Sequence, residues 1–131
     1  MRTTAQTLGD DAESVVAATL IQAGWTILAR NVRAGRGELD LVGVDPGPPA
    51  QLVIVEVRWR GSRGFGLGEE TIDHRKRAHL RTAIGRLLED GLPGVALPRY
   101  SLRVDVVIVE PPAAGSAASG PIIRHHRAIP L

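Results

Sequence analysis

The chain has 131 residues, of which 44% are hydrophobic and 23% charged, so it is long enough for one globular domain and short for two. Its four aromatic residues, Trp25, Trp59, Phe65 and Tyr100, are too few for a platform on which single-stranded nucleic acid stacks its bases. The absence of cysteine excludes disulfides, zinc–thiolate sites and thiol nucleophiles. No apolar stretch approaches a membrane span or a signal segment, so we expect a soluble, cytoplasmic protein.

The formal net charge of +2 is unevenly distributed along the chain. Residues 58–86 carry seven Arg and one Lys against three acidic residues, whereas residues 1–57 carry four Arg against seven acidic residues. A basic segment beside an acidic one is typical of a site that binds a polyanion together with a metal ion. The alternative is that the basic residues form only a solvated helix face. Lys76 is the only lysine of the chain.

The first predicted element is a helix over residues 10–23, capped by Asp10 or Asp11 and ended by Gly24. Glu13 lies on the flank of its apolar stripe, which is formed by Ala12, Val15, Val16, Leu20 and Ala23.

Three strands are predicted next, over residues 25–31, 38–44 and 52–58, with a turn over residues 33–37 and a hairpin breaker over residues 45–49. Alternation places Asp40 on one face with Glu38 and Val42, and it places Glu56 on one face with Ile54 and Arg58. Charges inside such apolar strands are costly unless they have partners.

The Gly-rich stretch over residues 61–68 reads as a mobile basic loop, because it lacks the Gly-Lys-Ser/Thr ending of a phosphate-binding loop. Asp73 caps a second predicted helix over residues 73–90, which Gly91 and Pro93 end. Lys76 lies on its buried stripe, one turn before Leu80, and so should point inward, whereas the helix arginines can splay outward.

A further strand is predicted over residues 102–109, followed by a Pro/Ala/Gly-rich segment over residues 111–120. Residues 122–129 either form a final edge strand or are disordered. We therefore expect one α/β domain over residues 1–110, with a mixed central sheet of about four strands flanked by the two helices. Residues 111–131 are predicted to form a flexible arm.

Asp40 and Glu56 are suited to metal-dependent hydrolysis of a phosphodiester. Hydrolysis of a phosphodiester needs divalent cations that neutralise the phosphate and activate a water, and hard cations such as Mg²⁺ are held by carboxylate oxygens. Asp40 and Glu56 on adjacent strands supply two carboxylates, and Arg58 follows Glu56 on the same face. The pattern favours a Mg²⁺ or Mn²⁺ site.

These residues carry a family resemblance. Gly37-Glu-Leu-Asp-Leu41, Val53-Ile-Val-Glu-Val-Arg58, Phe65-Gly66, Lys76 and Arg103-Val-Asp-Val-Val107 resemble the YraN-like bacterial family, over roughly residues 9–110. That family is assigned to the restriction-endonuclease-like superfamily with the PD-(D/E)xK pattern. The resemblance implies a restriction-endonuclease-like domain in which Asp40 and Glu56 are the acids of the pattern. It also implies that Glu13 is the first-helix acid, a third metal ligand, and that Lys76 is the family's helix lysine.

Arg58 departs from this pattern, which has Lys at that position. Arg keeps its proton near neutral pH and presents a planar fork suited to phosphate, so it can do only the electrostatic part of a lysine's work. Three alternatives follow: Arg58 works electrostatically, Lys76 supplies the ammonium, or the site is catalytically inactive and still binds nucleic acid. Catalytic roles are therefore predicted for Asp40, Glu56, Arg58 and Lys76.

The partner implied is nucleic acid, with DNA favoured, and a homodimer is one alternative for the oligomeric state. Non-specific contacts with its phosphates are predicted for five basic residues, Arg60, Arg63, Arg75, Arg77 and Arg81. The competing interpretations are structural: Glu56 and Arg58 form an ion pair, and Glu13 only flanks a surface helix. Asp105 is expected to pair with Arg103 or another basic residue, with orientation of part of the site as the alternative. Trp59 is expected in the core, with stacking on a base as the alternative. The histidines are expected at the surface or on phosphate, since they lack the spacing of a zinc site; these are His74, His79, His125 and His126.

Overall fold

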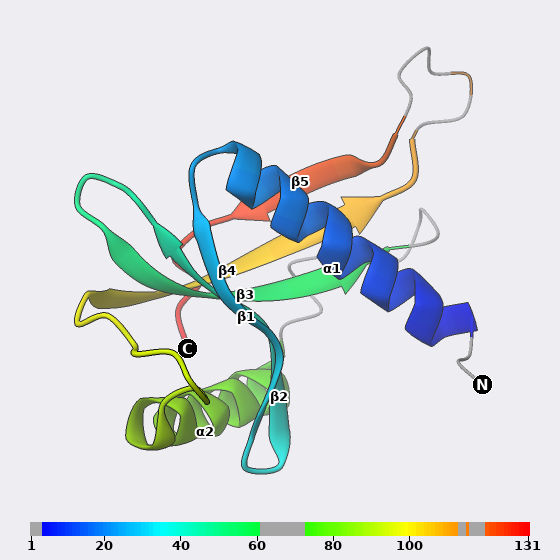
Figure 1. Ribbon diagram of the computed structural model, residues 1–131. Helices are drawn as coiled ribbons and strands as arrows, with labels where there is room; N and C mark the ends of the chain where they lie inside the picture. The colour runs from blue at the N-terminus through cyan, green and yellow to red at the C-terminus, as the bar shows by residue number, and fades with distance from the viewer. Residues whose placement is uncertain (1–3, 61–72, 113–114, 116–119) are drawn as a thin grey trace.

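Five strands in the described part of the chain form one mixed sheet, with a helix against each face (Figure 1). The computed structural model describes residues 4–60, 73–112, 115 and 120–131, with side chains from Asp11 onward. The elements in chain order are α1 (Thr4–Gln22), β1 (Thr26–Ala34), β2 (Gly37–Asp45), β3 (Gln51–Trp59), α2 (His74–Asp90), β4 (Ser101–Glu110) and β5 (Ile122–His126).

The strands lie in the sheet in the order in which they occur in the chain, β1-β2-β3-β4-β5. β3 and β4 are parallel, and α2 lies in the connection between them, whereas the other three pairs are antiparallel. The prediction of a mixed α/β sheet is confirmed. The strand number is five instead of about four, because residues 122–126 pair with β4 in register from Val106↔His126 to Glu110↔Ile122.

The two faces of the sheet carry separate hydrophobic cores. Val53 and Val55 of β3 are buried under α1, whereas Ile54 of the same strand packs with α2. A strand that is buried on both faces reads as a continuous apolar run, which accounts for the composition of β3. The helix residues that cover the two faces are Ala12, Val16, Ala17 and Leu20 on one side and Leu80, Ala83, Ile84 and Leu87 on the other.

The ends of several elements differ from prediction. α1 begins at Thr4 and ends at Gln22, so Ala23 lies beyond the helix and is exposed, not part of the stripe. β1 continues to Ala34, because Ala34 pairs with Gly37 across the turn. Asp73 caps α2 as predicted, accepting a hydrogen bond from the backbone N–H of Lys76 at 2.9 Å.

Two predicted segments cannot be compared in full. The predicted loop over residues 61–68 lies outside the described residues, as does most of the predicted flexible segment over residues 111–120. Among the helices described, none is long and apolar enough to cross a lipid bilayer.

Candidate active site

The site begins at a fork between β2 and β3. The two strands pair from Asp45↔Gln51 as far as Leu41↔Val55, and β2 then continues with β1 alone. Beyond the last pair, the carboxylate of Asp40 accepts a hydrogen bond from the backbone N–H of Val57 at 2.8 Å. A side-chain oxygen thus replaces the missing strand neighbour, which holds Asp40 beside the position of Glu56.

Glu56 is buried, with 3% of its surface exposed. Its Oε1 lies 3.1 Å from Nζ of Lys76 and 3.8 Å from Nη2 of Arg58. With both carboxyl groups ionised, Oε2 of Glu56 is buried and has no hydrogen-bond donor within the described residues. One oxygen of this buried carboxylate is therefore neutralised by cations, and the other lacks the partner that a buried charge requires.

The pKa of Asp40 is raised to about 8, chiefly by burial and next by the neighbouring charge of Glu56. The hydrogen bond from Val57 opposes this increase, whereas the charge of Glu13 and a hydrogen bond with Glu56 contribute to it. Two carboxyl groups in one poorly solvated place resist ionising together, and Lys76 and Arg58 approach the carboxylate of Glu56. Glu56 is therefore the ionised member of the pair, and Asp40 is the one that holds a proton or faces an added cation.

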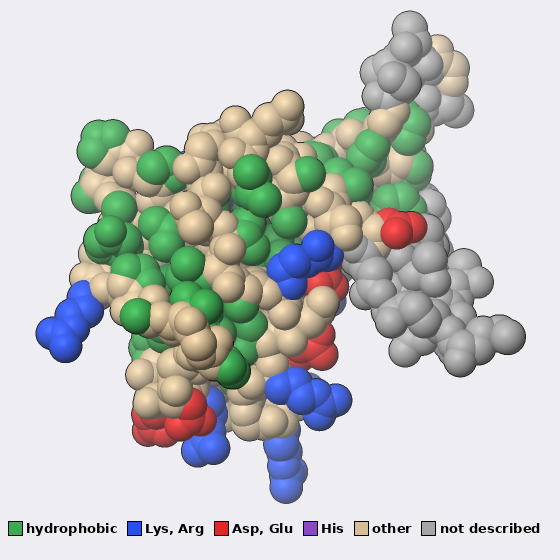
Figure 2. Space-filling view, in the orientation of Figure 1, with side chains coloured by type: hydrophobic (Ala, Val, Ile, Leu, Met, Phe, Trp, Pro, Cys, Tyr) green, Lys and Arg blue, Asp and Glu red, His purple; other side chains and the backbone are tan. Residues whose placement is uncertain are grey.

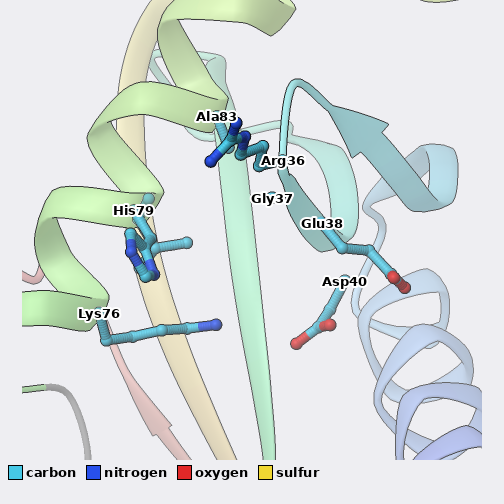
Figure 3. Close-up of a pocket in the computed structure, with 8 residues that line it drawn as sticks. Arg36, Gly37, Glu38, Asp40, Lys76, His79 and Ala83 are labelled. Carbon is cyan, nitrogen blue, oxygen red and sulfur yellow. The ribbon is translucent and has the colours of Figure 1, made fainter.

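Lys76 reaches the site from α2. The Asp73 cap fixes the start of this helix, and Lys76 lies one turn before the buried Leu80, which turns its side chain towards the sheet. Its ammonium group points to the region of Asp40 in the close-up (Figure 3). The predicted inward orientation of Lys76 is confirmed, and the lysine and Arg58 converge on the same carboxylate.

Glu13 is also buried, with 9% exposure, but it stands apart from the pair. When the amide of Asn31 is oriented to donate, its nitrogen lies 2.7 Å from Oε1 of Glu13 and 3.1 Å from Oε1 of Glu38. No group of three or more His, Asp or Glu side chains in the described ranges is arranged to hold a metal ion. Glu13 thus acts on Asp40 through its charge, and the structure does not bring it into a three-carboxylate centre with Asp40 and Glu56.

Asn31 is a site residue that sequence reasoning missed. It has a positive φ of 52° inside β1, a conformation that Asn tolerates better than most residues. A lone Asn within a strand pattern is the one signal that pointed to it. Its position lets one amide group face the carboxylates of both Glu13 and Glu38.

A cavity of about 380 Å³ opens beside the carboxyl pair, between α2 and the β1–β2 hairpin (Figure 3). In the close-up, Lys76 and Asp40 face each other across it, whereas Glu38 points away from Lys76. The lining residues are Arg36, Gly37, Glu38, Asp40, Lys76, His79, Leu80 and Ala83. The cavity gives a solvent-borne ligand access to Asp40 and Lys76.

The predicted phosphate-binding residues are scattered. Arg75 and Arg81 are exposed on α2, and Arg77 is half-buried on the same helix. Arg60 is half-buried at the end of β3, where its backbone N–H donates to the carbonyl of Val109 at 2.9 Å. Arg63 lies outside the described residues. None of these described arginines lines the cavity beside Asp40.

Two predictions about other residues are wrong. Trp59 is 37% exposed and lies by an apolar cavity with Val109 and Pro111. His125 is not at phosphate or free at the surface; its Nε2 lies 2.8 Å from Oδ2 of Asp105. The alternation along the strand predicted the face of Trp59 but not whether a helix covers it.

Asp105 of β4 anchors a second polar cluster. It is fully buried and accepts two hydrogen bonds from Arg103, both at 2.9 Å, and one from the backbone N–H of Ala128 at 3.0 Å. Arg103 also lies 2.9 Å from Asp45. Hydrogen bonds with His125, Arg103 and the backbone N–H of Ala128 lower the pKa of Asp105 to about 2 despite its burial. The predicted pairing of Asp105 with Arg103 is confirmed, and the bond from Ala128 ties β4 to the residues after β5.

Fold and site together define a small α/β protein with a five-stranded mixed sheet and a carboxyl pair at a strand fork. A model of the family described as "Uncharacterised protein family UPF0102" matches residues 12–109. The chain belongs to this family, and the resemblance to the YraN-like proteins is confirmed.

Several relatives are similar over most of their length. A UPF0102 protein of Persephonella marina is 41% identical over 102 residues, which cover 77% of this chain and 81% of the relative. A UPF0102 protein of Moorella thermoacetica is 38% identical over 109 residues, covering 83% and 85%. One of Kineococcus radiotolerans is 39% identical over 110 residues, covering 84% and 85%.

Proposed function

We propose that the protein binds nucleic acid and hydrolyses its phosphodiester bonds at the fork between β2 and β3, as a metal-dependent endonuclease. The observation that carries the proposal is the convergence of Asp40, Glu56 and Lys76, with the ammonium 3.1 Å from Glu56. The PD-(D/E)xK pattern implied by the family resemblance supports it, as does the basic segment that follows β3.

The carboxyl pair suits Mg²⁺ or Mn²⁺. Mg²⁺ is commonly held by one or two carboxylates, with waters and substrate phosphate oxygens completing its shell. Burial and the neighbouring charge of Glu56 raise the pKa of Asp40, while Lys76 and Arg58 approach Oε1 of Glu56. A divalent cation between the two carboxylates would neutralise the charge that otherwise keeps Asp40 protonated. The ion would supply charge neutralisation at the phosphate and a more acidic water.

The basic side chains have separate tasks in this proposal. Lys76 approaches Glu56 from α2 and lines the cavity, so its ammonium can stabilise charge on the scissile phosphate and orient the attacking water. Arg58 cannot exchange its proton near neutral pH, and at 3.8 Å from Glu56 it contributes positive charge. Lys76 thus takes the place of the lysine that the pattern has at position 58.

DNA is the substrate we favour, and Arg60, Arg75, Arg77 and Arg81 would add sequence-independent attraction to phosphates. Arg63 keeps the same predicted role from its sequence position. A cytoplasmic location, where nucleic acid is accessible, fits this function.

A second candidate is a catalytically inactive protein that retains nucleic-acid binding. The observation in its favour is that Lys76 and Arg58 already pair with Glu56, so that the chain itself neutralises one oxygen of the carboxylate. A self-neutralised pair needs no metal ion, and phosphate could then bind to the two cations alone.

The two candidates differ in cleavage. The purified chain is incubated with single-stranded, duplex and branched DNA, with Mg²⁺, with Mn²⁺ or with chelator, and the products are separated by size. We expect metal-dependent cleavage that Asp40→Ala and Lys76→Ala abolish and that Glu38→Gln, which alters the same cavity on a side chain pointing away from Lys76, retains. No cleavage by the wild type on any substrate, with cleavage appearing in Arg58→Lys, would establish the inactive alternative instead.

A further inference from the structure

The cavity beside Asp40 continues into a second one. This second cavity has a volume of about 470 Å³ and shares Arg36, Gly37 and His79 with the first. It adds Gly35 from the hairpin turn, and Thr82 and Arg86 from α2. Because three residues line both cavities, we treat the two as one groove, which leads from Asp40 along α2 towards the C-terminal end of the helix.

The walls of the groove follow from helix and hairpin geometry. His79, Thr82 and Arg86 are three and four residues apart, so they lie on one flank of α2, and the distance from Lys76 to Arg86 along the axis is about 15 Å. The opposite wall is the turn of the β1–β2 hairpin. A Cβ placed on Gly37 would lie 3.2 Å from Cβ of Ala83, so hairpin and helix touch at the floor of the groove.

Basic side chains line the groove at both ends. Lys76, Arg36 and Arg86 line it in addition to His79, whereas its acidic residues, Glu38 and Asp40, line only the cavity at the carboxyl pair. Lys and Arg side chains project around the turn of the hairpin and the adjacent part of α2 in the space-filling view (Figure 2). Arg86 has two acidic neighbours, Glu89 at 4.0 Å and Asp90 at 3.7 Å, but both pairs are long and solvent-exposed, so a phosphate can replace them at little cost.

We propose that this groove binds one strand of nucleic acid through its phosphates, with Arg36 and Arg86 as contacts, and leads that strand to Asp40. The inference rests on the proposed function, for which it specifies the binding path and the form of the substrate. A length of about 15 Å is enough for more than one phosphate of a single strand to lie along the groove.

The size and the side chains of the groove favour binding of a single strand of nucleic acid without sequence specificity. Each cavity has the volume of a small-ligand site, and the contact between Gly37 and Ala83 closes the groove below, so it offers room for one backbone and not for both strands of a duplex. No Trp, Tyr or Phe is among the described residues that line it. Binding therefore depends on phosphate charge and not on base stacking, and it should weaken steeply with salt.

This path differs from the one expected from the sequence. Arg81 is exposed on the same helix as Arg86, yet it lines neither cavity. Arg30 and Arg99 are also exposed and outside the groove, and neither has a proposed phosphate contact. They provide a matched control, because the double variant Arg30→Ala/Arg99→Ala loses the same charge as Arg36→Ala/Arg86→Ala.

The test measures affinity for a short labelled oligothymidylate by fluorescence anisotropy over a range of salt concentrations, in chelator so that no cleavage occurs. Each phosphate contact on a single strand contributes about 0.7 to the slope of log K against log salt. The groove double variant should therefore lose about 1.4 from the slope and bind about tenfold more weakly at 0.15 M salt. The control double variant should stay within about twofold of the wild type, and circular dichroism verifies that both variants are folded.

The outcomes separate this inference from the proposed function. Absence of binding by the wild type to any nucleic acid would refute the proposed function itself. Wild-type binding that the groove and control variants reduce equally would refute the groove and leave the proposed function standing. A groove variant that loses affinity for a duplex of the same length, but not for the single strand, would overturn the assignment to one strand.

Discussion

Removing the charge of Asp105 should make the stability of the protein less dependent on pH. Asp105 is fully buried and is held by Arg103, His125 and the backbone N–H of Ala128. Asp105→Asn keeps the size of the side chain and one acceptor oxygen but removes the negative charge that Arg103 faces.

The magnitude follows from the pKa of Asp105, which is lowered from 3.8 to about 2. Because the folded state binds this proton less tightly than the unfolded state, the ionised carboxylate stabilises the fold above the unfolded pKa, and the gain disappears as pH falls through the folded pKa. The shift corresponds to about 2 kcal/mol at pH 7, of which about 1 kcal/mol is already lost at pH 3.

The assay is urea unfolding of the wild type and Asp105→Asn at several pH values from 3 to 7. Every other carboxyl group is common to both proteins, so the difference between their free energies of unfolding isolates Asp105. We expect this difference to shrink by about 1 kcal/mol as the pH is lowered from 7 to 3. A difference that stays constant over that range would refute the reasoning that Asp105 is charged and stabilised by its hydrogen bonds.

Three further substitutions test the fold and the fork. Lys76→Met leaves the buried Glu56 with Arg58 alone at 3.8 Å and should lower the free energy of unfolding by about 3 kcal/mol. The exposed control Arg81→Met should change the free energy of unfolding by less than about 0.5 kcal/mol. Equal effects of the two substitutions would contradict the ion pair between Lys76 and Glu56. Ile54→Ala opens a cavity in the fully buried centre of β3 and should cost about 4 kcal/mol in urea unfolding, so a cost below about 1 kcal/mol would be inconsistent with this core. Asp73→Ala removes the helix cap and should cost about 1 kcal/mol by the same measurement, and an unchanged stability would argue against the bond to Lys76 N.

The parts of the fold that depend on local pattern were predictable. Apolar periodicity placed α2 and the inward orientation of Lys76, and the Pro-rich breaker after Asp45 placed the β2–β3 hairpin. Local signals sufficed there because helix caps, turns and face alternation each involve only a few neighbouring residues.

The remaining parts depend on contacts between distant segments. Whether residues 122–126 form a strand is decided by the edge of β4, and the exposure of Trp59 is decided by which segments pack on the end of β3. Arg36 and Arg86 come together only because the β1–β2 hairpin packs against α2. For the candidate site, the two acids were visible in the sequence, but their shared environment and the conformation of Asn31 were not.

The fork at which β2 leaves β3 has a consequence for association between copies of the chain. Past the pair Leu41↔Val55, one side of β3 is no longer covered by a strand ladder, and such an open edge invites pairing with another chain. The carboxylate of Asp40 caps Val57 there, and Glu56 places a buried charge on the adjacent residue. We therefore expect these acidic groups to disfavour pairing with another chain, so replacing them with apolar residues should reduce solubility as well as any activity.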